Sequence, residues 1–537
     1  MPKIYPFLQW TSEGHYDILH TVKKTPDALS HDSQEEIIMK KRRCIAWILA
    51  FLMILPLVAC QKESNEDNPQ TATAEVTPVQ ETEPEETIPL DDYGRPIIED
   101  TVPEGLDFDG VTLNYITSNE YLLDCYIEEM NGELLNDLLY NRWAYAEQEL
   151  NVNFSSTLTN YDATHTPIQK AVKAGDTSYD CTLFHRVEAD ALAPGGYLLN
   201  LYDVPYIDLE QVWWSSDMVD EMTWKDKLYV LTGDVLLSSV AYVSVIFFNK
   251  NMAEKWLPDT DLYQLVKDYN WTLDTFQSLN QRVYSDENGN GEKDPGDIYG
   301  LLVSSVDQLM LATDVEVTAR NNDGSMSIAL LSEKLVDRFD KFIGMLHNTN
   351  GILKLQQTTE NNNLVKDAFA EGRVLFRSTL YKNVVQLRDM KDDYGVLPNP
   401  MADESSGEYR NNSCHENNLL AVISNCQKTE ALGAALELMA AYSYRHVIPA
   451  FFEVSMKYKY SRIDGANDPQ FDMFDIITSD SHYDFGFIFG DILNNPLNIL
   501  RSITQEDKPY VSTITSNMNA MESALERLLA KLESPGE

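Results

Sequence analysis

The clearest chemical pattern in this chain is a short acidic loop of twelve residues. Oxygen-bearing side chains stand at its positions 1, 3, 5, 9 and 12, namely Asp286, Asn288, Asn290, Asp294 and Asp297, with Gly291 at position 6 and Glu292 at position 7. Calcium binds about six to eight hard oxygen atoms, and this spacing lets one tight loop supply them, with Glu292 using its backbone carbonyl. The pattern predicts a structural calcium site. Asp297 is shorter than the glutamate that such loops prefer, and the alternative is an acidic turn without metal.

Catalytic motifs are much weaker than this loop. The chain has no HExxH, no GxSxG and no GxxxxGK followed by Ser or Thr, which removes three common hydrolase and nucleotide signatures. It has 85 Asp and Glu residues, so any two carboxylates carry little weight as a glycosidase pair. We therefore expect no catalytic residues and no enzymatic activity.

A cysteine near the amino end points to covalent lipid chemistry. Residues 39–60 read MKKRRCIAWILAFLMILPLVAC, which is a basic segment, an apolar run and a terminal cysteine. The run is too short to cross a bilayer and predicts a secretory signal peptide over residues 39–59. Its end resembles the lipobox of bacterial lipoproteins, which implies that the mature chain begins with an acylated Cys60 on the outer face of the cell membrane. The alternative is a transmembrane anchor with an incidental cysteine.

The flanking segments have distinct compositions. Residues 1–38 come before the basic segment where a signal peptide should start, so we expect that they are not translated. Residues 60–106 are acidic and rich in Thr, Pro, Gln and Asn, which predicts a disordered stalk behind the acylated cysteine.

Charge and length limit the possible functions. The chain has 41 Lys and Arg against 85 Asp and Glu, a net charge of −44. This charge repels phosphate backbones and anionic lipid headgroups, so we expect no nucleic-acid partner and a membrane contact made through lipid alone. The remaining length suffices for two lobes, each with its own core. Of the six cysteines, Cys125, Cys181, Cys414 and Cys426 allow three pairings, but buried thiols are favoured in a chain of this size.

The hydropathy pattern predicts an α/β fold. Strands are expected at residues 111–118, 151–158 and 180–185, with helices at 134–150 and 166–174 between them. A further strand at 242–250 precedes longer helices, and extended segments return at 373–380, 393–401 and 417–425. We expect lobe 1 at residues 107–245, lobe 2 at 246–370, lobe 1 again at 371–416 and lobe 2 again at 417–537. Crossings of this kind indicate hinge strands.

Several segments, in this order, resemble the extracellular solute-binding proteins of carbohydrate-type ABC importers, the family of maltose-binding protein. They are AGDTSYDCTLFH with GGYLLNL, KLYVLTGDV, SVIFFNKNMAEKWLP, NWTLDTFQSL, DAFAEGRVLFRSTLY and DYGVLPNPM. The resemblance implies a two-lobed periplasmic-binding-protein-like fold with hinge strands between the lobes. It also implies a monomer that delivers a small solute, most simply a carbohydrate or oligosaccharide, to ABC permease subunits. Residues 455–504 match no part of the family pattern.

The family positions suggest a set of ligand-binding candidates. Sugars offer apolar ring faces and hydroxyl rims, so their sites combine aromatic rings with carboxylates, amides and Arg. The candidates are Asn119, Glu120 and Tyr121 after the first strand, His185, Arg186 and Glu188 after the third, Arg377 and Tyr381 after the returning strand, and Trp213, Trp214 and Tyr242 near the lobe junction. For each, the alternative is an ordinary surface or core side chain. Of the adjacent tryptophans, we expect one in the core and one available to a ligand or partner.

Two other function classes stay open. A lipid-anchored glycan-degrading enzyme would need a pair of carboxylates in a cleft and would turn over glycans. A surface adhesion protein would have no small-ligand cleft.

Overall fold

The computed structural model describes residues 6–10, 16–20, 89, 95–118, 124–412, 417–457, 469–479 and 481–536. The chain divides into two units, residues 1–87 and residues 88–537. In the first unit, β1 (Pro6–Trp10) and β2 (Tyr16–His20) pair in antiparallel fashion. The predicted signal peptide and Cys60 lie outside the described residues. Within the described part, no helix combines the length and hydropathy needed to span a membrane.

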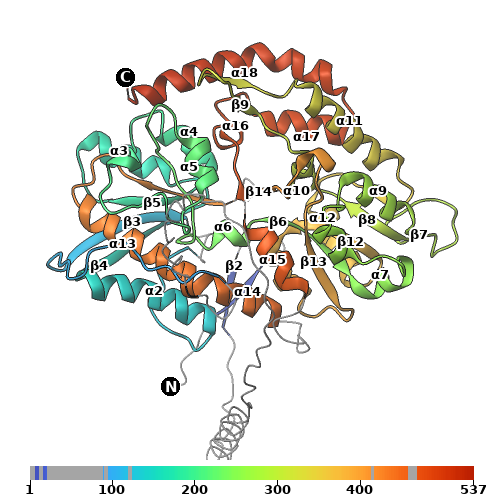
Figure 1. Ribbon diagram of the computed structural model, residues 1–537, viewed down its shortest axis with the longest axis horizontal. Coiled ribbons are helices and arrows are strands. Elements are labelled where there is room, and N and C mark those ends of the chain that lie inside the picture. Colours follow the sequence, from blue (N-terminus) through green and yellow to red (C-terminus); the bar gives the residue numbers. More distant parts are fainter. Residues whose placement is uncertain are drawn as a thin grey trace, which may run out of the picture. The chain divides into compact units, whose positions relative to one another are not determined.

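The second unit contains two sheets (Figure 1). The sheet of lobe 1 has the order β15-β5-β3-β4, in which β3 lies parallel to β4 and β5 while β15 runs antiparallel to β5. Its strands are β3 (Val111–Ser118), β4 (Val152–Thr159), β5 (Cys181–His185) and β15 (Asn418–Val422). The predicted strand at 111–118 is confirmed, and the next two predicted strands agree within one residue. The parallel core of this sheet directs the carboxyl ends of β3, β4 and β5 to one edge.

The sheet of lobe 2 has the order β11-β8-β12-β6-β13, with β7 paired to β8. β8 lies parallel to β11 and β12, whereas β6 runs antiparallel to both β12 and β13. Its strands are β6 (Ser244–Asn249), β7 (Tyr284–Ser285), β8 (Ile298–Val303), β11 (Ile352–Lys354), β12 (Val374–Leu380) and β13 (Tyr394–Pro398).

Helices cover both sheets and supply most of the two cores. Lobe 1 uses α2 (Leu134–Leu150), α3 (His165–Ala174), α4 (Ala189–Leu192), α5 (Ser216–Met222) and α13 (Thr429–Tyr442). Lobe 2 uses α6 (Ser238–Ala241), α7 (Lys250–Trp256), α8 (Leu262–Lys267), α9 (Leu273–Gln281), α10 (Asp307–Met310), α11 (Glu333–Asn348), α12 (Thr359–Ala370), α14 (Ile448–Lys457), α15 (Pro469–Ser479) and α17 (Pro496–Glu506).

The local sequence explains these helices. In α11, Leu335, Phe339, Phe342 and Leu346 are all buried, and their spacing places them on one face. Thr272 caps α9, because its side chain accepts a hydrogen bond from the Thr275 N–H.

The strand pairing departs from the predicted division into lobes. Residues 371–416 were expected in lobe 1, but β12 and β13 pair with β6 and lie in the sheet of lobe 2. Residues 417–537 were expected in lobe 2, but β15 and α13 belong to lobe 1. The prediction was wrong because buried strands of both sheets have the same continuous apolar character, so their sequences do not identify their partners.

Before the carboxyl-terminal segment, the described chain changes core between Leu236 and Leu237, between Tyr409 and Leu419, and at the π-helical turn Ser443–Val447 that joins α13 to α14. The last crossing is helical throughout. A π turn inside a helix is rare and is frequently found at functional sites, and here it stands where one continuous helix leaves one core and enters the other.

The carboxyl-terminal segment, residues 481–536, also belongs to both lobes. After β16 (Ser481–His482), α16 (Phe485–Ile488) packs into the core of lobe 1. The last helix, α18 (Tyr510–Glu533), places Tyr510, Ile514 and Met521 in the core of lobe 2 and Ala524, Leu525, Leu528 and Leu532 in the core of lobe 1 (Figure 1). Two short ladders complete the fold: β9 (Thr318–Arg320) with β10 (Met326–Ile328), and β14 (Asn411–Asn412) with β16.

This packing predicts that the end of α18 stabilises lobe 1. Leu528 is 1% exposed, so we expect Leu528→Ala to lower the free energy of unfolding by about 2–5 kcal/mol in urea denaturation. Glu526→Ala, on the exposed face of the same helix, is the matched control and should change it by less than about 0.5 kcal/mol. Equal effects of the two substitutions would contradict the packing.

Candidate functional site

A polar cavity lies between the two lobes. Its polar lining consists of Arg186, Asp307, Asn417, His482, Tyr483 and Asp484. Its apolar lining consists of Leu311, Val315, Phe487, Ile488 and Leu497. Arg186 comes from the carboxyl end of β5 in lobe 1, Asp307 from α10 in lobe 2, and Asn417 from the second crossing. The cavity volume is about 40 Å³, room for a few water molecules, so a sugar ring enters only if the lobes move apart.

A guanidinium group holds the carboxylate of Asp307 in place. Arg501 of α17 donates from Nε to Oδ1 at 2.8 Å and from Nη2 to Oδ2 at 2.7 Å. Asp307 is buried, and this two-point contact fixes the orientation of its carboxylate.

Backbone donors hold the second carboxylate of the cavity, Asp484. Its Oδ1 accepts from the Phe487 N–H at 2.8 Å, which caps α16. Its Oδ2 accepts from the N–H groups of Val317 and Thr318 at 3.1 and 3.2 Å. Burial raises the pKa of Asp484 to about 7, against these donors. The side chain therefore ties the start of α16 to the chain entering β9.

Among the residues that line the cavity, His482 can gain a positive charge by protonation. Its Nδ1 lies 3.1 Å from Oδ1 of Asp217 in α5. Burial lowers the pKa of His482, but the hydrogen bond and charge of Asp217 outweigh burial, so the pKa lies above its usual value.

The predicted residues after β5 lie together at the edge of the lobe 1 sheet, but only Arg186 lines the cavity. The His185 Nδ1 lies 2.8 Å from Asp162 Oδ1, and its ring centroid is 4.9 Å from that of Tyr161. Glu188 is buried and accepts from both the N–H and the Nδ1 of His165. Asn119, Glu120 and Tyr121, predicted at the end of β3, lie outside the described residues. The edge therefore combines imidazole, carboxylate and guanidinium groups, as predicted, with an aromatic ring from Tyr161 that the sequence did not single out.

The adjacent tryptophans correct one prediction. Trp213 and Trp214 are both buried, whereas one was expected to be available to a ligand or partner. Their Nε1 atoms donate to the two carboxylate oxygens of Glu437, at 3.0 and 2.8 Å. Burial raises the pKa of Glu437 to about 7. The two indoles therefore hold α13 in place through Glu437, because a buried carboxylate needs hydrogen-bond donors.

The remaining ligand candidates lie inside lobe 2 or at the lobe junction. Arg377 is buried and donates to Oε1 of Gln386 at 2.6 Å. Tyr381 is buried among phenylalanine rings, including Phe451 and Phe474. Tyr242 is buried with the Lys382 Nζ 3.7 Å from its ring centroid. The lining of the cavity includes none of these three side chains.

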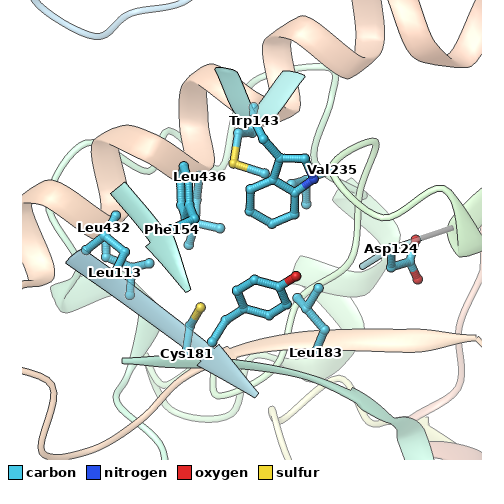
Figure 2. Close-up of a pocket in the computed structure, with 11 residues that line it drawn as sticks. Leu113, Asp124, Trp143, Phe154, Cys181, Leu183, Val235, Leu432 and Leu436 are labelled. Carbon is cyan, nitrogen blue, oxygen red and sulfur yellow. The ribbon is translucent and has the colours of Figure 1, made fainter. Parts of the chain in front are cut away.

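A second cavity, of about 20 Å³, lies within the core of lobe 1. Figure 2 shows Trp143 and Leu183 pointing toward it, with Asp124 at its edge. The Asp124 carboxylate accepts from the Ser238 N–H at 3.0 Å and from Asn418 Nδ2 at 2.9 Å. Because the lining is otherwise almost entirely apolar, we interpret this space as a packing gap. Cys181 lines it, and Cys125, Cys181 and Cys426 are all buried thiols, as predicted; Cys414 lies outside the described residues.

Hydrogen bonds within the acidic loop occupy most of the predicted calcium ligands. Asp286 accepts from the N–H groups of Gly289 and Gly291 at 2.7 and 2.9 Å. The Asn288 and Asn290 amides both donate to Oδ2 of Asp294, at 2.8 and 2.7 Å. In the described residues, no three His, Cys, Asp or Glu side chains are grouped to hold a metal ion. Calcium would therefore require both amides to turn their oxygen atoms inward.

Asp297, the last of the predicted ligands, is fully buried. It accepts from the Glu287 N–H at 3.2 Å and from the Tyr299 hydroxyl at 3.4 Å. These contacts join the loop to β8, a structural role that needs no ion.

Calcium binding stays a prediction, with a direct measurement. We expect calcium to raise the Tm relative to the same protein in chelator, because an ion bound by the native state stabilises it by mass action. Asp294→Asn should remove most of that shift, while Asp323→Asn, in the exposed turn between β9 and β10, should retain it. No calcium-dependent shift in the unsubstituted protein would leave the loop as a turn without metal.

Comparisons with known proteins agree with this architecture. No family model matches the chain, and no curated protein matches it. The sugar-binding protein MalE from Xanthomonas citri aligns with a TM-score of 0.53 at 13% identity, covering 79% of this chain and 100% of its own. The cyclic α-maltosyl-1,6-maltose binding protein from Arthrobacter globiformis aligns with a TM-score of 0.51 at 12% identity, covering 78% and 99%. UspC from M. tuberculosis aligns with a TM-score of 0.50 at 14% identity, covering 77% and 100%. The chain therefore has the two-lobed, periplasmic-binding-protein fold of MalE-like sugar-binding proteins, as its sequence resemblance implied.

Proposed function

We propose that this chain is a lipid-anchored extracellular substrate-binding protein that captures a carbohydrate between its lobes and delivers it to an ABC transporter. The main support is the polar cavity between the lobes, where Arg186, Asp307 and Asn417 come from three different parts of the chain. Proteins with the same fold bind sugars, according to their names. The proposal joins these two facts.

The cavity chemistry suits a neutral, hydroxyl-rich ligand. The carboxylate oxygens of Asp307 accept hydrogen bonds from hydroxyl groups, while Arg186 and Asn417 donate to hydroxyl and ring oxygens. Phe487 and Leu311 offer apolar contact to the carbon faces of a sugar ring. The carboxylate of Asp307 is already oriented by Arg501, so little ordering accompanies binding.

Closure and release follow from a shift between two states. A ligand that touches Arg186 of lobe 1 and Asp307 of lobe 2 makes both contacts only when the lobes are together. It therefore favours the closed state by its difference in affinity for the two states. The closed form would then dock on permease subunits, and the ATPase would be a separate chain.

One observation favours an enzyme as the second candidate. Asp307 and Asp484 both line the cavity, and burial raises the pKa of Asp484 to about 7, as a general acid would require. However, both oxygens of Asp484 accept backbone hydrogen bonds and both oxygens of Asp307 bind Arg501. Carboxylates held by these hydrogen bonds are better suited to a structural role than to proton transfer. Release of reducing ends from a glycan panel would favour the enzyme.

Ligand binding is tested by thermal shift with neutral mono- and oligosaccharides, peptides and polyamines. We expect a sugar at about one hundred times its Kd to stabilise the protein by about 2.7 kcal/mol. Arg186→Ala should weaken binding of that sugar by roughly 10- to 100-fold, because a charge-assisted hydrogen bond contributes about 1.5–3 kcal/mol. Arg282→Ala, an exposed arginine of lobe 2, is the control. A protein that no compound stabilises would instead favour an adhesion role.

Lipid anchoring is tested separately. We expect Cys60→Ser to abolish incorporation of labelled palmitate and to move the protein from the membrane fraction to the medium, because acyl chains would be its membrane contact. Cys44→Ser, within the predicted signal peptide, should leave both unchanged. Retention of the Cys60→Ser protein in membranes would support a spanning anchor.

A further inference from the structure

His482 lies between carboxylates of the two lobes. On one side its Nδ1 is 3.1 Å from Oδ1 of Asp217, in the first turn of α5 in lobe 1. On the other side its Nε2 is 3.8 Å from Oε1 of Glu316, which stands between two buried valines of the lobe 2 core. The imidazole therefore faces one carboxylate from each lobe across the boundary where they meet.

The backbone next to His482 is held to both lobes as well. Oδ2 of Asp217 accepts from the Tyr483 N–H at 2.6 Å. Asp484 binds the N–H groups of Val317 and Thr318 on the lobe 2 side. His482 itself pairs with Asn412 in the short β14–β16 ladder. These contacts fix the ring in place, so its charge acts at a defined point of the boundary.

Carboxylates outnumber the cations around this ring. Asp217 and Glu221 approach from α5, Glu316 from the chain before β9, and Asp484 from the histidine's own segment. Arg410, before β14, forms an ion pair with Glu316.

Arg320, in β9, donates to the carbonyl oxygens of Asp220 and Glu221 at 3.1 and 2.9 Å, at the carboxyl end of α5. A neutral imidazole would leave Asp217 without a cationic partner, since neither arginine is bound to that carboxylate by these contacts. A protonated His482 supplies this charge.

We infer that His482 is a positioning residue that joins the closed lobes as a cation, so that opening of the lobes releases its proton. The inference rests on the proposed function only in taking lobe separation as the step that exchanges ligand. It adds that capture is coupled to pH through one side chain.

The sign follows from the two states of the cluster. With the lobes together, the pKa of His482 lies above its ordinary value, because Asp217 outweighs burial and Arg410. A separation of the lobes that takes Asp217 away from the ring lowers the pKa, because Asp217 is the group that raises it most. The contribution to closure is therefore complete below the ordinary pKa of His, about 6.5, and is lost as the pH rises through the closed-state value.

Burial also acts on the pKa values of two neighbouring carboxyls. Burial raises the pKa of Asp484 to about 7 and also raises that of Glu221. The pH profile of the unsubstituted protein therefore belongs to the whole cluster, and only substitution isolates the histidine.

The test measures lobe separation without any ligand, so it is independent of finding one. Spin labels on Ala174→Cys in α3 and Lys334→Cys in α11, both exposed, report the distance between lobes in the full chain with Cys60 and Cys414 replaced by Ser. From about pH 5.5 to about pH 8.5 we expect the open fraction to rise, by up to about tenfold for each pKa unit between the two states.

Three substitutions decide the assignment. His482→Gln should remove most of the pH dependence, and Asp217→Asn should do the same if the glutamine variant does not fold. His347→Gln is the matched control, because His347 pairs with Asp507 at 2.7 Å entirely within lobe 2, and it should retain the full pH dependence.

A lobe distance that is independent of pH, or equal pH dependence in His482→Gln and the unsubstituted protein, would overturn the inference. The proposed function would be unaffected by that outcome. Conversely, failure of every sugar in the thermal-shift screen would leave the pH-dependent opening intact.

Discussion

The structure depends on polypeptide that is shared between two separate hydrophobic cores. Each sheet and its helices bury their own apolar side chains, but the crossing segments and α18 belong to both lobes. The end of α18 seats Leu525, Leu528 and Leu532 in lobe 1, a burial worth roughly 5–9 kcal/mol. As long as these leucines stay buried in lobe 1, the two lobes can rotate only as far as the continuous helix α18 allows. The carboxyl-terminal segment therefore restrains any opening together with the other segments that join the lobes, and it connects the stability of one lobe to the position of the other.

The polar groups at the boundary of the lobes share a second property: each is held by a partner behind it. Arg501 orients Asp307, Asp217 orients His482, and backbone N–H groups orient Asp484. Buried polar groups without partners are costly, and half-bound ones would move, so this second layer of contacts determines which atoms face the cavity. The same arrangement explains why two carboxylates in one cavity are not by themselves a catalytic pair. Each of their oxygens already accepts a hydrogen bond from a donor that the fold supplies, which fixes the orientation of both groups.

Much of the fold was predictable because periodicity and capping are local. The strand at Val111–Ser118, the helix at Leu134–Leu150 and the cap at Thr272 could be read from neighbouring residues alone. The site was predicted much less well. Arg186 was found through the family resemblance, which implies ligand-binding residues after the third strand of lobe 1. Asp307, His482 and Asp484 were missed: the last two lie in a stretch without any family pattern, and a single acidic residue among so many carries no signal. The burial of Trp213 and Trp214 was predicted wrongly for one of the two, because the residue type alone does not show whether a tryptophan side chain is buried or exposed.

By itself, the sequence determined the order of strands and helices and the strongly acidic surface. It also determined which chemistry is open to Cys60, namely acylation, and to the acidic loop, namely calcium binding. These are properties of composition and of residues a few positions apart. Only the tertiary structure decided which sheet received β12, β13 and β15, because strand partners are chosen by packing between distant segments whose apolar sequences are interchangeable. It alone also brought Arg186, Asp307 and His482 to one cavity, since residues separated by more than a hundred positions become neighbours only when both cores have formed.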